Sequence, residues 1–333
     1  MRTRRFGSWR TIQSSQSGAY AQTAPHSKYV VTRHDRNAMK NPVNFELRIG
    51  VAAAMTIAIV ALSLASIFIT RLEGAEMPAL VIAFYRMAIT TALLLPPALV
   101  FRRKEIASLA RKDFGLLALG GLCLAIHFGA WIASLEYIPI ATSVVLVNSH
   151  PVFVVIASYL FLGERPARRS LLGAAVGLAG MVVMSHDALN GLQLALKGDG
   201  LALIGALAVV GYFIVGRKAR ARISLLGYVT PLYAVCSVVL LIFVLVSGDA
   251  LAPYSASVWA NLAALAVVPT IIGHTLFNWS IKHVKPATIS VTFLGEPVVA
   301  GLLALIFFGQ RPPLATFIGG ALVLAGVYLT TSK

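Results

Sequence analysis

The stretch that decides the fold is IATSVVLVNSHPVFVVIASYLFLGERPARRSLLGAAVGLAGM, residues 140–181, because the chain contains it a second time. Shifted by 146 residues, it aligns without a gap on PATISVTFLGEPVVAGLLALIFFGQRPPLATFIGGALVLAGV, residues 286–327. Positions shared by the copies include the pairs Ala141 and Ala287, Thr142 and Thr288, Pro151 and Pro297, Gly163 and Gly309, Arg165 and Arg311, Pro166 and Pro312, Gly173 and Gly319, and Gly180 and Gly326. An internal repeat of this kind indicates two related halves.

The composition around the repeat is that of an integral membrane protein. Of the 333 residues, 58% are hydrophobic and 12% are charged, and the mean hydropathy is +0.82, whereas soluble domains have about 25% charged residues. The net charge of +16 lies in short clusters between apolar runs, which indicates topology signals and no nucleic-acid partner. Cys123 and Cys236 lie within apolar runs, so we expect packing residues and no metal site, disulfide or cofactor.

Residues 1–47 differ from the rest of the chain. They are rich in Arg and Ser, nearly free of acidic residues, and lack the apolar core of a secretory signal. Two interpretations remain open: a basic, disordered cytoplasmic tail, or a transit-like or mis-started extension whose true start is Met39.

The remaining chain contains ten apolar runs of roughly 17–25 residues, the length of a membrane-spanning helix. They cover 49–70, 78–101, 114–135, 137–161, 168–185, 199–217, 224–247, 256–279, 286–308 and 313–331. We therefore predict an all-α integral membrane protein with ten transmembrane helices.

The basic residues between these runs predict the orientation. With both termini in the cytoplasm, the inner loops hold Arg102, Arg103, Lys104, Arg111, Lys112, Arg165, Arg168, Arg169, Arg217, Lys218, Arg220, Arg222, Lys282 and Lys285, and the outer loops hold Arg71, Lys197 and Arg311. This asymmetry follows the positive-inside rule. Because each half has an odd number of helices, the halves, residues 48–185 and 199–331, are predicted to be two inverted five-helix repeats.

These residues carry a family resemblance. Two five-helix halves, each with a proline in its fourth helix and a GERP-like turn before the fifth, resemble the EamA family of the drug/metabolite transporter (DMT) superfamily, and the segment from Pro78 to Thr90 is similar to that family's second helix with its Arg. Gln310 departs from the Glu that the family usually has, as in Glu164. The aromatic and His residues in the middle are similar to those of YddG-type amino-acid exporters.

The resemblance implies a secondary transporter that works by alternating access in the plasma (inner) membrane. The aromatic and His residues suit export of aromatic or neutral amino acids, while Glu296 also suits efflux of organic cations. A membrane-embedded enzyme is less favoured, since the sequence has no H-E-x-x-H or G-x-S-x-G motif, and a channel is less favoured because a channel usually has a recognisable filter or charged ring. The absence of a Walker-A motif argues against primary active transport. The expected partners are the small-molecule substrate and the lipid bilayer, with the protein as a monomer or weak homodimer.

Glu296 is the only charged residue between Lys285 and Arg311, and the repeat places it opposite His150. Each precedes a helix-kinking proline, Pro151 or Pro297, and each proline frees the carbonyl four residues earlier. One interpretation is that both side chains satisfy polar groups at the kinks. The other is that Glu296 faces an aqueous cavity and binds a cation or a proton.

Two further groups of polar residues share helix faces. His127 and Trp131 lie four residues apart in the third helix, as do Thr270, His274 and Asn278 in the eighth, and inverted repeats would place these two helices opposite each other. They are predicted to line a central substrate cavity, although single buried histidines also hold helices together.

Arg86 keeps its charge and needs a partner, which is either a gate residue or a substrate carboxylate. Trp279, Tyr85 and Tyr212 are candidate cavity walls, or else lipid-facing or core residues.

Small residues predict where helices touch. In the fifth and tenth helices they are Gly173, Gly177, Gly180, Gly319, Ala321 and Ala325.

Overall fold

The computed structural model describes residues 42–153, 157, 160, 168–184, 193–251, 253–283, 293 and 295–331. The chain divides into two compact units, residues 1–45 and 46–333, and the described part of the first unit is the start of α1. Most of the predicted tail, and the first-copy turn at Gly163, Arg165 and Pro166, lie outside the described residues. The first helix begins at Pro42, earlier than the start of the predicted span at 49, because proline suits the first turn of a helix.

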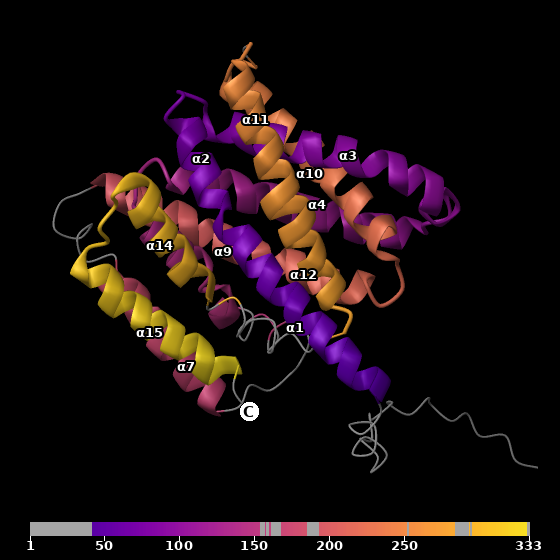
Figure 1. Cartoon of the computed structure of the whole chain (residues 1–333). Helices are drawn as coiled ribbons and strands as arrows, with labels where there is room; N and C mark the ends of the chain where they lie inside the picture. Colours follow the sequence, from indigo (N-terminus) through magenta and orange to yellow (C-terminus); the bar gives the residue numbers. More distant parts are fainter. Residues whose placement is uncertain are drawn as a thin grey trace, which may run out of the picture. The chain divides into compact units, whose positions relative to one another are not determined.

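Within the described residues the fold consists of helices without strands (Figure 1). The elements are α1 (Pro42–Ser63), α2 (Ala65–Glu73), α3 (Ala79–Ala107), α4 (Arg111–Ser134), α5 (Ile140–Val147), α7 (Arg168–Met184), α9 (Gln193–Ala219), α10 (Leu225–Ser247), α11 (Ala256–Leu265), the π-helix η3 (Ala266–His274), α12 (Thr275–Ser280), α14 (Gly295–Phe308) and α15 (Leu314–Thr331). The all-helical prediction is confirmed.

Six of these helical segments are long and apolar enough to cross a membrane. They are Gly50–Glu73, Ala79–Ala107, Arg111–Ser134, Leu196–Ala219, Leu225–Ser247 and Ala256–Ser280. Shorter apolar helices cover Ile140–Phe153, Leu171–Val183, Gly295–Phe308 and Leu314–Gly326. The chain is therefore a multi-pass membrane protein, and the complete ten-helix inverted arrangement stays a prediction.

Three helix pairs make the most extensive contacts: α7 with α15, α4 with α9, and α3 with α10. The pair α7 and α15 is plainly visible side by side in Figure 1. The main hydrophobic core lies among α1–α5, α9–α12 and α14, and a second, smaller cluster joins α5, α7, α9 and α15.

Glycines allow α7 and α15 to approach closely. A Cβ atom on Gly180 would lie 2.6 Å from the Gly319 carbonyl oxygen, and one on Gly326 would lie 2.5 Å from the Gly173 carbonyl oxygen. The predicted contact through glycines is therefore confirmed. The prediction that Ala321 and Ala325 also lie in this contact is wrong, because both residues are exposed. At about 100° per residue, they lie on a different side of α15 from Gly319 and Gly326.

The eighth predicted span contains a π-helix that the sequence analysis missed. It covers Ala266–His274 and contains Pro269, which lacks a backbone donor. Two hydroxyl groups donate to carbonyl oxygens five residues earlier, as the wider turn requires: Thr270 to Leu265 at 3.1 Å and Thr275 to Thr270 at 3.4 Å. Short π segments in α-helices are frequent at functional sites.

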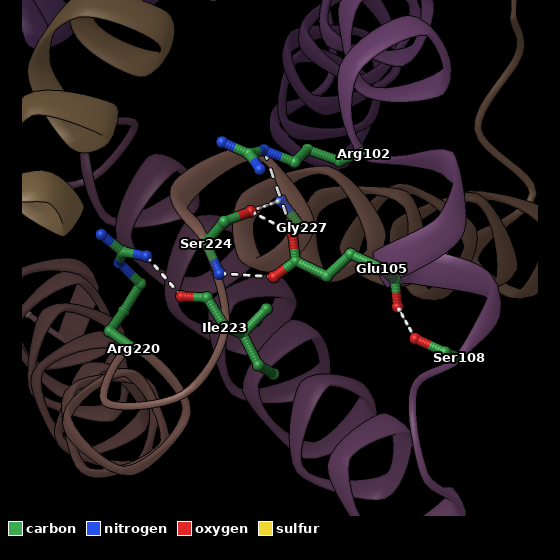
Figure 2. A network of polar contacts seen from close by, with 7 residues as sticks. All are labelled: Arg102, Glu105, Ser108, Arg220, Ile223, Ser224 and Gly227. Carbon is green, nitrogen blue, oxygen red and sulfur yellow. Dashed lines mark hydrogen bonds and ion pairs between the residues drawn. The ribbon is translucent and has the colours of Figure 1, made fainter.

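At one end of the molecule, α3 is tied to the start of α10 by the network shown in Figure 2. The Glu105 carboxylate accepts hydrogen bonds from Ser224 N at 2.7 Å and Ser224 Oγ at 2.6 Å. The Ser224 hydroxyl in turn accepts from Gly227 N and so caps α10. An ion pair of 2.6 Å between Arg222 and Asp113 adds the start of α4. These contacts bring the α3–α4 and α9–α10 connections together.

Candidate functional site

A small polar cavity lies in the middle of the helices, with a volume of about 40 Å³. Its lining residues come from α1, α2, α3, α4, α5 and the residues that follow it, α9, η3, and α14 with Phe293 just before it. They are Leu62, Ala65, Arg86, His127, Trp131, Val147, Asn148, His150, Val209, Phe213, His274, Phe293 and Glu296. We call this space the central cavity. It has room for a few water molecules, since one water needs about 10–15 Å³ on this measure.

Arg86 reaches the central cavity from α3 and is completely buried. Its Nε atom donates to Thr270 Oγ1 at 2.8 Å, which ties α3 to the π-helix. The guanidinium carbon lies 4.0 Å from the centroid of the Phe128 ring, in a cation–π contact. Neither Nη atom has a hydrogen-bond partner among the described residues. The guanidinium is therefore fixed on one edge and has free donors on the others.

His127 and Trp131 reach the cavity from α4. The His127 ring contacts the Gly205 carbonyl oxygen through Nδ1 at 2.9 Å, so Nδ1 carries a hydrogen and donates it. The two rings are stacked, 6.1 Å apart with an interplanar angle of 12°. Trp131 Nε1 is buried and pairs with no group in the described part of the chain. His274 lies nearby, edge-on to Phe128 at 5.3 Å.

Glu296 and His150, the residues paired by the repeat, both line the central cavity but make different contacts. His150 Nδ1 lies 3.3 Å from the carbonyl oxygen of Val147, the group that Pro151 frees. Its contact agrees with the interpretation that this side chain satisfies the kink. The Glu296 side chain hydrogen-bonds with Asn148 and lies in the field of Arg86. Glu296 is thus directed toward polar groups of the cavity.

Five residues predicted to line the cavity lie outside its lining, and one of them, Thr270, instead accepts a hydrogen bond from Arg86. Asn278 and Tyr212 belong to a second polar cluster completed by Tyr233: Asn278 Nδ2 donates to Tyr212 OH at 2.5 Å, and its contact with Tyr233 OH is 3.3 Å. Tyr85 packs on Tyr254 and Trp259, and Trp279 packs on His283.

The second polar cluster adjoins the cavity through His274, whose carbonyl oxygen accepts from Asn278 Nδ2 at 2.8 Å. On its other side, Arg220 Nε donates to the Asn278 carbonyl oxygen at 3.1 Å. The cluster therefore lies between the central cavity and the α9–α10 connection.

Asn148, Phe213 and Phe293 are among the lining residues that were not predicted from the sequence. Asn148 had a usable signal, since it is a polar residue in an apolar run two positions before His150. The two phenylalanines had none, because nothing in the sequence distinguishes them from the other 14 of the 16 Phe.

Apolar spanning helices around a buried polar cavity define the class: a multi-pass membrane protein of the transporter type. The model of the EamA-like transporter family matches residues 48–186 and again residues 196–332. The chain therefore belongs to the EamA-like transporter family, within the drug/metabolite transporter superfamily.

Relatives of this chain are transporters by name. An uncharacterized transporter of Archaeoglobus fulgidus is 27% identical over 83% of this chain and 94% of its own length. The pseudopaline exporter CntI of Pseudomonas aeruginosa is 28% identical over 78% of this chain and 89% of its own. A probable terminal-alkyne amino-acid exporter of Streptantibioticus cattleyicolor is 28% identical over 67% of this chain and 74% of its own.

One crystal structure has a TM-score of 0.62 to this chain at 21% identity, covering 84% of this chain and 97% of the other. This similarity concerns the fold alone.

Proposed function

We propose that this protein exports small metabolites, in particular neutral or aromatic amino acids, by alternating access through the central cavity. The observation that carries the proposal is the lining itself: a buried guanidinium with free donors, a carboxylate and three histidines stand among Trp131, Phe213 and Phe293. Buried polar groups without partners are expensive and mark ligand sites in membrane proteins. The two relatives named as exporters, one of them for an amino acid, support the direction.

The transport cycle needs the helices to separate. A cavity of about 40 Å³ is too small for an amino acid, since ligand pockets are about 300–1,000 Å³. The structure thus corresponds to a form in which the helices close around the cavity. The π-helix η3 and the break at Leu64 between α1 and α2 are irregular points at the cavity where a bend can occur.

Efflux of organic cations is the second candidate, and Glu296 is the observation that favours it. Arg86 opposes it, because a fixed positive charge in the same buried cavity repels a cation. Efflux from proteoliposomes loaded with a panel of amino acids and cationic drugs tests both functions. Export of amino acids supports the proposal. Export restricted to cations supports the second candidate, and export of neither overturns both.

We also propose that the protein resides in the plasma (inner) membrane with both termini in the cytoplasm. The contact between Arg222 and Asp113 joins two connections that carry the basic clusters, and the Lys197 Nζ to Tyr137 OH bond of 2.7 Å joins two connections predicted to be outside. Each contact keeps two connections on a common side, as the proposed topology requires, and the basic clusters are the reason for assigning the first side to the cytoplasm.

The orientation and the inverted repeat can be tested together in a cysteine-free background. Arg168→Cys and Pro312→Cys occupy equivalent ends of the two halves, so an inverted repeat predicts labelling from opposite sides of the membrane. Labelling from the same side would contradict the inversion. Because the sequence indicates no obligate partner, the proposed oligomeric state is a monomer or weak homodimer.

A further inference from the structure

Among the described residues, the central cavity contains unpaired donors on Arg86 and Trp131, and opposite in character to them an unpaired acceptor on His150 and the carboxylate of Glu296. We propose that it binds its substrate as a zwitterion, with the substrate carboxylate on Arg86 and Trp131 and the substrate ammonium on Glu296 and His150. This inference rests on the proposed function and narrows its substrate class to molecules that carry both free groups.

The donor side is formed by three buried nitrogen atoms. Both Nη atoms of Arg86 and Nε1 of Trp131 lie at the cavity without a partner in the described residues. An N–H group buried in this way is strongly unfavourable unless a ligand pairs with it. A guanidinium edge with two free nitrogens matches a carboxylate, which binds it through two parallel hydrogen bonds. The indole N–H gives a third donor to the same kind of group.

The acceptor side is formed by Glu296 and His150. Glu296 is the one carboxylate among the described lining residues and is 7% exposed. Nδ1 of His150 is turned to the Val147 carbonyl and so carries the ring hydrogen, which leaves Nε2 of a neutral ring as an acceptor. This Nε2 atom is buried and lacks a partner in the part of the chain that is described. An ammonium group has three N–H donors and no acceptor, and thus fits these two side chains.

Charge balance explains why both groups of the substrate are required. Arg86 stays protonated, and Glu296 is the lining residue that can balance it. A zwitterion brings one charge of each sign, so every charge in the loaded cavity has an opposite neighbour. An amino-acid ester brings only a positive charge and leaves Arg86 without an anion. An N-acyl amino acid brings only a negative charge and leaves Glu296 without a cation, and buried unpaired charges are strongly disfavoured.

The apolar part of the substrate has a matching wall. Phe293 lines the cavity, and its ring centroid lies 5.1 Å from that of Phe277. The ring centroid of Phe213 lies 4.8 Å from that of Phe277. These rings extend the cavity lining with apolar surface next to His150. An amino acid whose side chain is aromatic or aliphatic can rest there while its charged groups bind Arg86 and Glu296.

The test measures efflux of labelled L-phenylalanine from proteoliposomes and competition by unlabelled L-phenylalanine, its methyl ester and its N-acetyl derivative. With the wild-type protein, we expect each derivative to compete at least roughly 30-fold more weakly than L-phenylalanine. Efflux of L-phenylalanine with equal competition by the derivatives would overturn the zwitterion assignment and leave the proposed function standing. Absence of efflux of any amino acid in the panel would overturn the proposed function, and this assignment with it.

Variants then assign each charge to its residue. Arg86→Gln should improve competition by the methyl ester relative to L-phenylalanine, because the positive charge that repels it is gone, and Glu296→Gln should do the same for the N-acetyl derivative. Arg220→Gln, which changes a buried arginine outside the cavity, should leave these competition ratios unchanged whatever its effect on rate. Ratios that stay at the wild-type values in Arg86→Gln and Glu296→Gln would contradict the assignment.

Folded protein is measured in parallel by size-exclusion chromatography in detergent. If Arg86→Gln does not fold, Arg86→Lys replaces it: the charge stays, the paired geometry is lost, and L-phenylalanine alone should compete more weakly. Unchanged competition by L-phenylalanine in Arg86→Lys would contradict binding of the carboxylate by this residue.

Discussion

The close packing of α7 on α15 predicts that two alanine substitutions in the same helix have opposite effects. A Cβ atom on Gly326 would lie 2.5 Å from the Gly173 carbonyl oxygen and 2.5 Å from Gly177 N, so backbone atoms oppose it. A Cβ atom on Gly320 would meet only the Val145 side chain, at 3.7 Å. Gly326→Ala should therefore destabilise the protein, and Gly320→Ala should be neutral or stabilising.

The magnitude follows from the geometry. Non-bonded carbon atoms prefer about 3.5–4.0 Å, so Gly326→Ala forces the two helices apart by roughly 1 Å. Overpacking of this kind costs about 1–3 kcal/mol. The gain of roughly 1 kcal/mol in helix propensity is common to both substitutions and cancels between them. The expected difference between the variants is thus about 1–3 kcal/mol, or several degrees in Tm.

The assay is thermal unfolding of both variants in the same detergent, followed by the loss of the monodisperse peak in size-exclusion chromatography. The Gly320→Ala variant is the matched control, because it adds the same methyl group to the same helix. Equal Tm values for the two variants would contradict the predicted loss of stability in Gly326→Ala and show that α7 and α15 do not meet through Gly326.

Three further outcomes are expected. Glu105→Ala should lower the free energy of unfolding by about 1–3 kcal/mol, since both hydrogen bonds from Ser224 to its carboxylate are lost. A double-mutant cycle with Ser224→Ala should show coupling between the two residues, and additive effects would contradict the existence of these hydrogen bonds. Arg222→Gln, which breaks an exposed ion pair with Asp113, should change stability by less than about 1 kcal/mol, and a larger loss in thermal unfolding would contradict this. Trp131→Ala should reduce efflux per folded molecule roughly tenfold with little loss of folded protein, because contact area with the substrate is removed; normal efflux with collapsed expression would identify Trp131 as a packing residue.

The helices were predictable because the bilayer imposes a length and an apolar composition that the sequence displays directly. The sequence was also sufficient to predict that His127, Trp131 and His274 line one cavity. Helical spacing places residues on a face, and the repeat indicates which faces are opposite. Arg86 and Glu296 stood out as charges in apolar runs.

The remaining lining could not be predicted, because it depends on tertiary packing. Asn278 was expected on the same face as Thr270 and His274, but the π-helix contains Thr270 and His274 and ends before Asn278. Hydrogen bonds spanning five residues shift the register of everything downstream, and Asn278 turns to Tyr212 instead. The proline in this span was visible, but Pro269 alone does not distinguish a kink from a π-turn.

Passage of the substrate through the central cavity can be measured directly by substrate protection of a cysteine placed in the cavity lining. Val209→Cys replaces a valine of the lining with a side chain of similar size. Val210→Cys places a thiol on the next residue, which is outside the lining. Both variants are made in a protein whose Cys123 and Cys236 have been replaced. If substrate passes through the central cavity, a membrane-impermeant maleimide should label Val209→Cys during turnover, and saturating L-phenylalanine should slow that labelling severalfold, with Val210→Cys unaffected. Labelling of Val209→Cys at the same rate with and without L-phenylalanine, in protein that still exports it, would contradict the account.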